Sequence, residues 1–235
     1  MKVVAVIPCY DEETMIADIV KRASGVVDGV IVVDNGSKNG TANIARKVGA
    51  MVVECGEHGA GAATEFGMNT ALETEHHNII VTLDGDGQHN ADEIPKLVKP
   101  IKNGKADLVI GSRFLGEYKL PKYRKFGIDV ITWLYNFGYK QKITDGQSCF
   151  RAYSREALKV IMPIEERGFA FSVETLIKAR VNGLRIVEVP ISCIYHNRRQ
   201  DSTLNPIGHG LSVAFGVVKW RMKSALLHRE NKPRN

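Results

Sequence analysis

The feature that most constrains the fold is a series of short apolar runs that alternate with segments of helical period. Aliphatic and β-branched residues predict strands at 3–7, 30–33, 50–53, 79–83 and 108–110. Apolar residues recur at helical spacing over 15–23, 41–48, 62–72 and 93–102, with Thr41 and Asp92 as expected N-caps. Strands that are apolar throughout and alternate with helices predict an α/β fold, with a mainly parallel central sheet covered by helices on both faces.

Polar clusters follow four of these strands. They are PCYDEE at 8–13, DNGSKNGT at 34–41, DGDGQH at 84–89 and GSRF at 111–114. Each cluster alone is typical of a solvated loop. Ligands of parallel sheets bind beyond the carboxyl ends of the strands, so four clusters at one edge predict a binding site. Tyr10 could stack there on a base, and Asp34 could accept hydrogen bonds from a base or ribose.

Two carboxylates, Asp84 and Asp86, stand two residues apart directly after an apolar strand, next to Gly85 and Gly87. Oxygen ligands favour Mg²⁺ or Mn²⁺ over zinc, and such ions are commonly completed by water and substrate phosphates. The pair therefore predicts half of a metal site that awaits a nucleoside diphosphate. A plain turn is the alternative, because Asp and Gly are common turn residues.

Length and composition limit the number of domains, the partners and the location that we expect. The 235 residues suit one domain, and the net charge of +6 favours anionic partners such as nucleotides, nucleic acid or an anionic membrane. Four scattered cysteines without a CxxC pair predict reduced thiols in a cytoplasmic compartment. We expect no secretory signal, since Met1 leads directly into a strand, and no membrane span, since charges interrupt the apolar stretch at 207–227.

The four clusters, together with DGQSCFRAYSREAL at 145–158, resemble the family 2 glycosyltransferases of the type A nucleotide-sugar-binding fold. Within that family the chain is most similar to dolichyl-phosphate mannose synthases and other polyprenyl-phosphate glycosyltransferases. The resemblance covers about residues 3–205. It implies one catalytic domain at 1–205, with a Rossmann-like nucleotide-sugar half at 1–115 and an acceptor half at 116–205. An amphipathic, basic helix and tail would follow at 206–235.

The resemblance also implies roles for individual residues. Catalytic roles fall to Asp86, Arg113 and Asp145. The matching nucleotide-binding positions are Pro8, Tyr10, Glu12, Asp34 and Asp84, and the Mg²⁺ or Mn²⁺ ligands are Asp84, Asp86 and Gln88. The implied acceptor- and phosphate-binding residues are Arg113, Arg124, Ser148 and Arg198.

Some positions are ambiguous or depart from the family pattern. Glu174 matches an acidic family position but equally suits an exposed helix residue, and Arg151 suits an ion pair at a helix start. Asn35 replaces a common acidic residue, Cys149 replaces a glycine, and Thr203 stands where a lysine often binds pyrophosphate. Because threonine is uncharged, Arg198, Arg199 or the metal would have to neutralise the departing diphosphate instead.

The reaction that the resemblance implies is an inverting, metal-dependent transfer of a hexose, with mannose favoured, from a GDP- or UDP-sugar to a polyprenyl or dolichyl phosphate. A phosphate acceptor is largely ionised at neutral pH and barely needs a base, so positioning becomes the main task. Arg113 and Arg124 could hold that phosphate. We therefore expect a peripheral protein at the cytoplasmic face of a membrane, with a possible membrane-anchoring subunit.

Segment 121–139 combines basic and aromatic residues and suits the headgroup region of a bilayer, although packing in the core explains the same pattern. Segment 207–227 is a second amphipathic, basic element for a leaflet or a partner subunit.

Three other functions compete with this one. A transferase that acts on a carbohydrate or protein hydroxyl needs a base, for which Asp145 is the best local candidate. The turn GEHGAGAAT at 56–64 faintly suggests the dinucleotide site of an NAD-dependent dehydrogenase. A non-catalytic nucleotide or nucleic-acid binder would use the basic surface, but no nucleic acid is expected as a partner, because aromatic and basic residues are not interleaved as in known RNA-binding modules.

Overall fold

A computed structural model describes residues 1–74, 76–116, 122–194 and 206–230, without the side chains of 122–124, 126, 206–209, 211 and 225–230. In this part of the chain, seven strands form one sheet in the order β3–β2–β1–β4–β6–β5–β7. The strands are β1 (Lys2–Cys9), β2 (Gly29–Asp34), β3 (Met51–Glu54), β4 (His77–Thr82), β5 (Leu108–Ser112), β6 (Arg151–Ser154) and β7 (Ile186–Pro190). The mainly parallel α/β sheet is confirmed.

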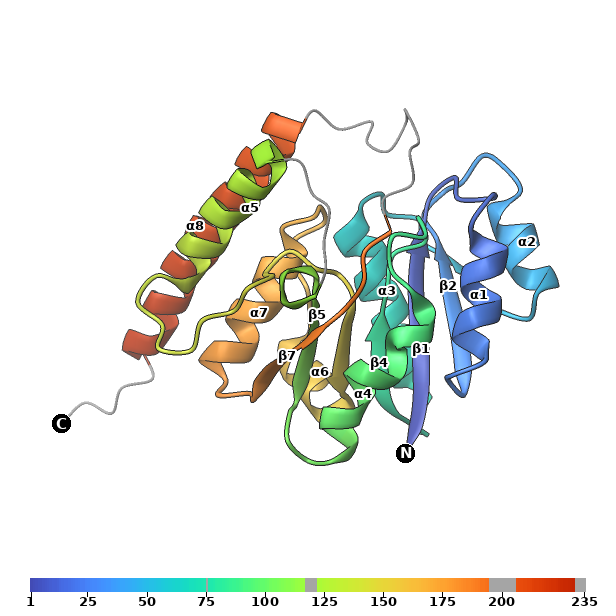
Figure 1. Ribbon diagram of the computed structural model, residues 1–235, viewed down its shortest axis with the longest axis horizontal. Helices are drawn as coiled ribbons and strands as arrows, with labels where there is room; N and C mark the ends of the chain where they lie inside the picture. The colour runs from blue at the N-terminus through green and yellow to red at the C-terminus, as the bar shows by residue number, and fades with distance from the viewer. Residues whose placement is uncertain (75, 117–121, 195–205, 231–235) are drawn as a thin grey trace.

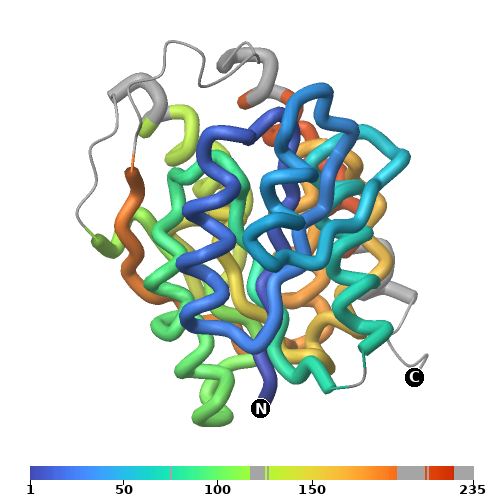
Figure 2. The backbone as a smooth tube through the Cα atoms, turned by 90° about the vertical axis from the view of Figure 1, so that its right-hand side faces the viewer, coloured from blue at the N-terminus to red at the C-terminus, as the bar shows by residue number. Residues whose placement is uncertain are grey.

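Helices cover both faces of the sheet (Figure 1). They are α1 (Ile16–Ser24), α2 (Thr41–Lys47), α3 (Ala60–Glu73), α4 (Ile94–Lys102), α5 (Lys122–Asn136), α6 (Arg155–Ile161), α7 (Phe171–Val181) and α8 (Pro206–Glu230), with 3₁₀ turns η1 (Ala91–Glu93) and η2 (Arg113–Leu115). In Figure 2, which looks along the sheet from one end, α1 and α2 lie nearest the viewer. Helices α5 and α8 pack side by side beyond α7.

The continuous apolar character of the strands follows from burial on both sides. In β1, Val4 and Val6 pack into one core with side chains of α3 and α7, whereas Ala5 and Ile7 pack into the other with α1 and α4. Strands β2 and β4 alternate between the same two cores. A strand that faces solvent on one side would instead alternate apolar and polar residues.

Strand direction brings the polar clusters to one edge. Strands β1, β2 and β4 run parallel to one another, and β5 runs in the same direction because β6 is antiparallel to both β4 and β5. The carboxyl ends of β1, β2, β4 and β5 therefore share one edge, which we call the rim, as the sequence predicts. The amino end of β6 also lies at the rim, so the loop at 143–150 enters the same region.

Both predicted N-caps are wrong, because Gly40 is the N-cap of α2 and Glu93 is the N-cap of α4. Thr41 is the first residue of α2, and the Asn39 side-chain oxygen accepts its backbone N–H at 3.1 Å. Asp92 lies inside η1, where the Asn90 oxygen accepts its N–H, also at 3.1 Å. In each case an asparagine two residues earlier forms the local turn, and Asn is as good an acceptor for this purpose as Thr or Asp.

Helix α8 belongs to the packed body of the protein. Val213, Val217 and Trp220 are buried in the core that also holds α3 and α7. No helix in the described ranges is both long enough and apolar enough to cross a bilayer. The division of the chain at residue 205 stays a prediction.

Helix α3 lies so close to the sheet that Gly67 has no room for a side chain. A Cβ there would lie 2.4 Å from Cγ1 of Val6 and 2.6 Å from Cγ2 of Val33. We expect Gly67→Ala to lower the free energy of unfolding by about 1–3 kcal/mol through overpacking. Gly127→Ala is the matched control, because Gly127 is also helical but no described atom lies within 4 Å of a Cβ there, and alanine should stabilise the protein by about 0.5–1 kcal/mol. Urea unfolding of both variants tests this, and equal shifts would contradict it.

Candidate active site

The loops of the rim are joined to one another by backbone and side-chain hydrogen bonds. After β1, the backbone N–H of Asp11 donates to Oγ of Ser37 at 2.9 Å, and an Asp11 carboxylate oxygen accepts the N–H of Lys38 at 2.8 Å. The N–H of Asn35 donates to the carbonyl of Cys9 at 3.0 Å. The loops after β1 and β2 therefore form one rigid wall of the site.

The residues expected to bind the nucleoside lie on this wall. Tyr10 is 51% exposed directly after β1, so its ring is accessible for stacking. Asp34 ends β2, and its Oδ1 accepts the N–H of Ser37 at 3.2 Å, which leaves Oδ2 without a partner in the described part of the chain. Pro8 is the second-last residue of β1, and the carbonyl of Glu12 accepts N–H groups at the start of α1.

Asn35, which departs from the family pattern, has a structural reason to be an amide. Its Nδ2 donates to the carbonyl of Glu57 at 2.7 Å, and its Oδ1 accepts the N–H of Gly59 at 2.8 Å. An ionised carboxylate can accept but cannot donate. Asparagine thus ties β2 to the loop before α3 in a way that aspartate cannot reproduce.

The acidic loop after β4 packs tightly against the end of β1. A Cβ on Gly85 would lie 2.9 Å from Cβ of Cys9 and 3.2 Å from the carbonyl of Pro8, so only glycine lets the loop approach so closely. The Asp86 carboxylate accepts the backbone N–H of Gln88 at 2.9 Å and its side-chain amide at 2.8 Å. Gly87 has a φ of +78°, which favours glycine.

Burial changes the protonation of this loop. Desolvation raises the pKa of Asp84 to about 6, and the positive charges of Arg113 and Arg151 offset only part of that effect. Desolvation lowers the pKa of His89 to about 4, so the ring is neutral at pH 7. Its contact with Asp84 at 3.7 Å is therefore not an ion pair. Asp84 is a partly exposed carboxylate whose negative charge is incompletely balanced.

A divalent cation fits this arrangement. In the ranges that the structure describes, no group of three or more His, Cys, Asp or Glu side chains could hold a metal by itself. Mg²⁺ needs only one or two carboxylates when waters and substrate phosphates complete its shell. Asp84 and Asp86, with the side-chain oxygen of Gln88, could hold such an ion, and the ion would balance the charge of Asp84.

Arg113 and Asp145 form a bidentate ion pair at the rim, in which the Asp145 side chain is fully buried. Nε and Nη2 of Arg113 donate to the two carboxylate oxygens of Asp145 at 2.7 and 2.8 Å, and the backbone N–H of Arg113 donates to the same group at 3.1 Å. Burial alone would raise the pKa of Asp145, but the Arg113 guanidinium outweighs it and lowers that pKa. The structure brings together these two residues, which stand 32 positions apart.

The other predicted phosphate-binding residues are less accessible or lie outside the described part. Ser148 is buried, and its hydroxyl accepts the N–H of Phe150 at 3.3 Å. The backbone of Arg124 lies in α5, but its side chain is outside the described residues, as are Arg198, Arg199 and Thr203 entirely.

Arg151 and Glu174 have structural roles. Arg151 begins β6 rather than pairing with an acid at a helix start, and its buried guanidinium donates to the carbonyls of Ser172 and Gly146. Glu174 is fully buried, so an exposed helix position is wrong. Its carboxylate accepts the N–H groups of Glu165 and Glu166 at 2.8 and 2.7 Å and pairs with Lys178.

The glycine-rich turn before α3 is not shaped for a dinucleotide. A pyrophosphate would need the N–H groups at the helix start, but those of Gly61 and Ala62 donate to the carbonyl of Arg167 at 2.8 and 3.3 Å. A Cβ on Gly59 would lie 2.2 Å from that oxygen, and one on Gly61 would lie 2.0 Å from the carbonyl of Glu166. These glycines allow protein backbone, not a ligand, to approach.

Two carboxylates that the sequence reading missed organise the rim. Glu93 accepts the N–H and hydroxyl of Ser192 at 2.8 and 2.9 Å, and the next residue, Cys193, forms a β-bridge with His89. Glu188 in β7 accepts hydrogen bonds from Thr144 and Asp145. The only available signal for Glu188 was a charge within the apolar run IVEVP.

Comparison with known proteins defines the family. The family model described as glycosyl transferase family 2 matches residues 4–162, which include the rim loops after β1, β2, β4 and β5. The chain belongs to this family, has the type A glycosyltransferase fold, and is a nucleotide-sugar glycosyltransferase.

Two relatives whose names state an activity are similar to this protein over most of its length. It is 36% identical to the UDP-N-acetylglucosamine–dolichyl-phosphate N-acetylglucosaminyltransferase of Methanococcus voltae, covering 81% of this chain and 84% of that protein. It is 31% identical to the undecaprenyl-phosphate mannosyltransferase of Micrococcus luteus, covering 83% and 84%. The fold is also that of glucosyl-3-phosphoglycerate synthase from Mycobacterium tuberculosis, solved with Mn²⁺, UDP and phosphoglyceric acid (TM-score 0.72, 21% identity, 93% and 78% coverage).

Proposed function

We propose that the protein transfers a hexose, with mannose the favoured sugar, from a GDP- or UDP-sugar to a polyprenyl or dolichyl phosphate, with inversion and with Mg²⁺ or Mn²⁺ as cofactor. The two relatives above use polyprenyl-type phosphate acceptors according to their names, but they carry different sugars. Their shared feature therefore supports the acceptor class more strongly than it supports mannose.

The observation that carries the proposal is the ion pair of Asp145 with Arg113, together with the lowered pKa of Asp145. A hydroxyl acceptor needs a general base whose pKa lies near the working pH. Asp145 has both oxygens engaged by Arg113 and a lowered pKa, which makes it a poor base. A phosphate monoester acceptor is already largely ionised and needs none. The geometry thus favours a phosphate acceptor over the competing hydroxyl acceptor.

Different residues of the rim would bind the nucleoside, the cation and the acceptor phosphate. Tyr10 and Asp34 would hold the nucleoside, and Asp84, Asp86 and Gln88 would hold the cation. That cation would stabilise the charge of the leaving diphosphate as a Lewis acid. The Arg113 guanidinium carries a positive charge at the rim beside Asp145 and would attract the acceptor phosphate. An acceptor held opposite the leaving group attacks in line, which gives inversion.

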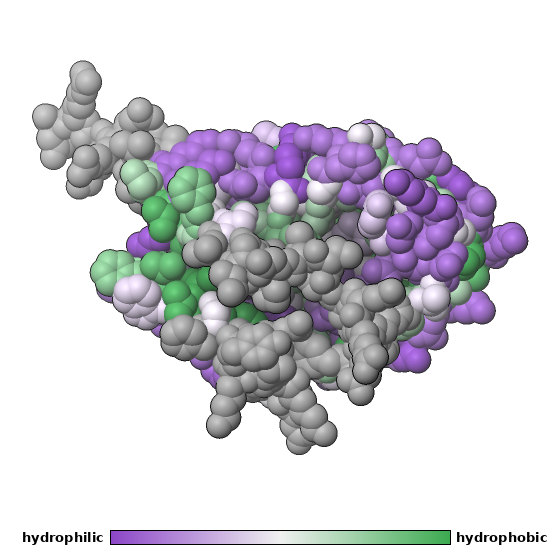
Figure 3. Space-filling model, turned by 90° about the horizontal axis from the view of Figure 1, so that it is seen from above, coloured by the Kyte–Doolittle hydropathy of each residue, from purple (hydrophilic) through white to green (hydrophobic). Residues whose placement is uncertain are grey.

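We propose that an apolar surface of α5 and α8 rests on the membrane that carries the acceptor. Its exposed side chains, here called the α5–α8 face, are Val130, Trp133, Phe137, Phe215, Val218 and Met222. Trp133 and Phe137 are each 61% exposed, whereas Ile131 and Tyr135 of the same helix are buried, so α5 serves both the core and this surface. Hydrophobic side chains gather at this end of the molecule in Figure 3.

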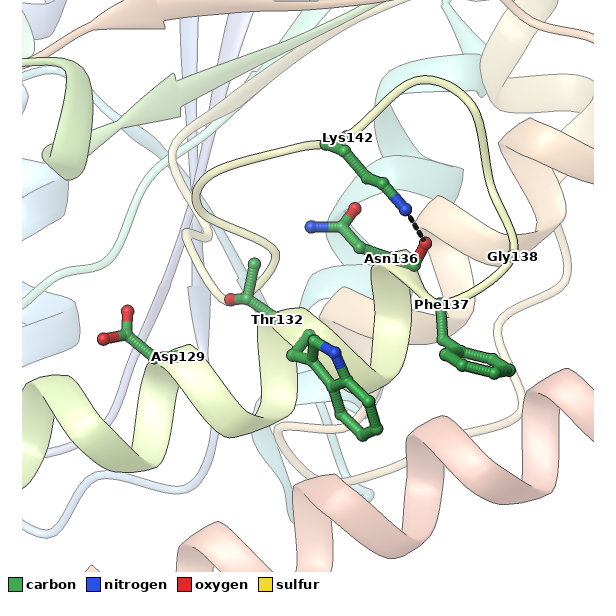
Figure 4. A pocket seen from close by; sticks show the side chains of 7 residues that line it. Asp129, Thr132, Asn136, Phe137, Gly138 and Lys142 are labelled. Atoms are coloured by element: carbon green, nitrogen blue, oxygen red, sulfur yellow. Dashed lines mark hydrogen bonds between the residues drawn. The ribbon is translucent and has the colours of Figure 1, made fainter.

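Two surface cavities and two cations adjoin the α5–α8 face. One cavity, of about 550 Å³, includes Trp133, Phe137 and Lys142, and the other, of about 360 Å³, lies between Phe137 and Met222. The Lys142 ammonium donates to the carbonyl of Asn136 (Figure 4), and Arg221 donates to the carbonyls of Leu134 and Tyr135. Positive charge beside an apolar surface suits anionic headgroups, which supports a cytoplasmic leaflet as the membrane surface in this proposal.

The acceptor class is tested with two lipids of equal chain length, a polyprenyl phosphate and the corresponding polyprenol. With Mn²⁺ and a panel of GDP- and UDP-sugars, we expect transfer to the phosphate and at least about 100-fold slower transfer to the alcohol, because no base is available for a hydroxyl. Radiolabelled sugar in the lipid phase is the measure. Comparable transfer to the alcohol would overturn the proposed acceptor.

The metal site is tested by Asp84→Asn and Asp86→Asn. Each should weaken donor binding in Mn²⁺ by about tenfold or more, equivalent to about 1.4 kcal/mol, while metal-free binding stays as in the wild type. Asp92→Asn is the control, since its exposed carboxylate lies nearby and pairs only with Arg22 in the described structure. Isothermal titration with and without EDTA gives both affinities. Unchanged Mn²⁺ dependence in the Asp84 and Asp86 variants would refute the site.

Membrane contact is tested by Phe137→Ser and Met222→Ser, one on each helix. We expect each to weaken binding to phosphatidylglycerol vesicles by about tenfold, because each removes an exposed apolar side chain that the bilayer would bury. Phe66→Ser on α3, where the ring is 41% exposed, is the control and should bind as the wild type does. Vesicle co-sedimentation at low and high salt provides the measurement. Equal loss in all three variants would exclude the α5–α8 face as the contact.

A further inference from the structure

We infer that Glu188 is a positioning residue that fixes the orientation of Arg113 through a relay of hydrogen bonds across the rim. The inference rests on the proposed function only for what Arg113 does, namely attract the acceptor phosphate. The relay itself joins three separate segments: β7, the loop at 144–145, and η2 with its preceding residue.

The first link runs from β7 to the loop. The Glu188 carboxylate accepts the backbone N–H of Thr144 at 2.8 Å and that of Asp145 at 3.0 Å, and its Oε1 accepts the Thr144 hydroxyl at 2.9 Å. No Lys or Arg within the described ranges forms an ion pair with Glu188. Three neutral donors from two adjacent residues therefore hold this carboxylate, and it in turn fixes the loop.

The second link has a defined direction. The N–H of Phe114 donates to Oγ of Ser112 at 3.2 Å, and the hydroxyls of Ser112 and Thr144 lie 2.6 Å apart. Because the Thr144 proton goes to the Glu188 carboxylate, the Ser112 proton must go to Thr144. Every donor in this chain then points toward Glu188, whose negative charge orders it and ties η2 to β7.

The third link fixes the orientation of the Arg113 guanidinium. The backbone N–H of Asp145 is held by Glu188, while its carboxylate accepts Nε, Nη2 and the backbone N–H of Arg113. Arg113 is thus fixed both by its main chain and by its side chain. A cation oriented before the acceptor arrives loses little freedom on binding, and small misplacements at such a site can cost about 100-fold in rate.

Glutamine cannot replace glutamate in this relay. The Thr144 N–H is shared between Oε1 at 2.9 Å and Oε2 at 2.8 Å. If the glutamine oxygen takes the place of Oε1 and keeps the bonds from Thr144 Oγ1 and Asp145 N, its amide nitrogen takes the place of Oε2 and lies 2.8 Å from the Thr144 nitrogen. Two donors would then face each other. The loop at 144–145 would shift, and Asp145 would carry Arg113 with it.

The test compares Glu188→Gln with a matched control on the same two strands. Asp107→Asn removes a carboxylate that joins β5 to β7 through Arg185 at the opposite end of the sheet, where it accepts Nε at 2.9 Å and the backbone N–H at 2.8 Å. Thr144→Val is a milder variant, because it removes the hydroxyl step but keeps both backbone bonds. All proteins are assayed with saturating donor, Mn²⁺ and varied polyprenyl phosphate.

We expect Glu188→Gln to lower kcat/KM for the acceptor by about 10- to 100-fold, with an unchanged donor dissociation constant. Thr144→Val should lose less, and Asp107→Asn should keep wild-type acceptor kinetics even if its melting temperature falls. Near-wild-type acceptor kinetics in a folded Glu188→Gln protein, or an equal loss in Asp107→Asn, would overturn the inference.

Amide hydrogen exchange tests the relay independently of the acceptor. Glu188→Gln should accelerate exchange at 112–115 and 144–146 but not at 84–89, whereas Asp107→Asn should leave 112–115 unchanged. Unchanged exchange at 112–115 in Glu188→Gln would remove the relay even if polyprenyl phosphate is the acceptor. A wild-type protein that transfers no sugar to polyprenyl phosphate but shows the expected exchange would refute the proposed function and support the relay.

Discussion

The structure depends on one constraint: a mainly parallel sheet buried on both faces has nowhere to place polar groups except at the ends of its strands. Its interior strands carry apolar side chains toward two separate cores. Charged residues in the middle of these strands would be buried without partners, at a cost of several kcal/mol. The chemistry of the protein is therefore confined to the rim, where strand ends leave N–H groups, carboxylates and space.

The antiparallel direction of β6 brings the loop before this strand to the rim. Because β6 runs antiparallel between β4 and β5, its amino end meets their carboxyl ends. The preceding loop delivers Asp145 to Arg113, and the buried Arg151 fastens the same loop to α7 through the carbonyls of Gly146 and Ser172. A purely parallel sheet would place a strand start, and with it this loop, on the opposite side from the acidic loop after β4.

Much of the fold follows from local pattern, and much of the site does not. Strands β1 to β5 and their helices were predictable because burial on both faces leaves a continuous apolar signature. The N-caps were misplaced because Asn39 and Asn90 supply the turn oxygens in place of Thr41 and Asp92. The buried positions of Glu174 and Glu188 were not predictable, since backbone N–H groups outside their own helix and strand hold these carboxylates, and such groups carry no residue-specific signal.

The same geometry suits the proposed acceptor, which has a polar phosphate and an apolar chain. Helix α5, whose outer surface is apolar, begins only seven residues after the end of η2 in the sequence. Arg221 of α8 and Lys142 bind the carbonyls at the far end of α5, which satisfies that helix end while keeping positive charge beside the apolar side chains. A lipid phosphate drawn toward Arg113 would have its chain leave on the side of α5. In the proposed function, the polar rim and the α5–α8 face would thus bind the two ends of one amphipathic acceptor.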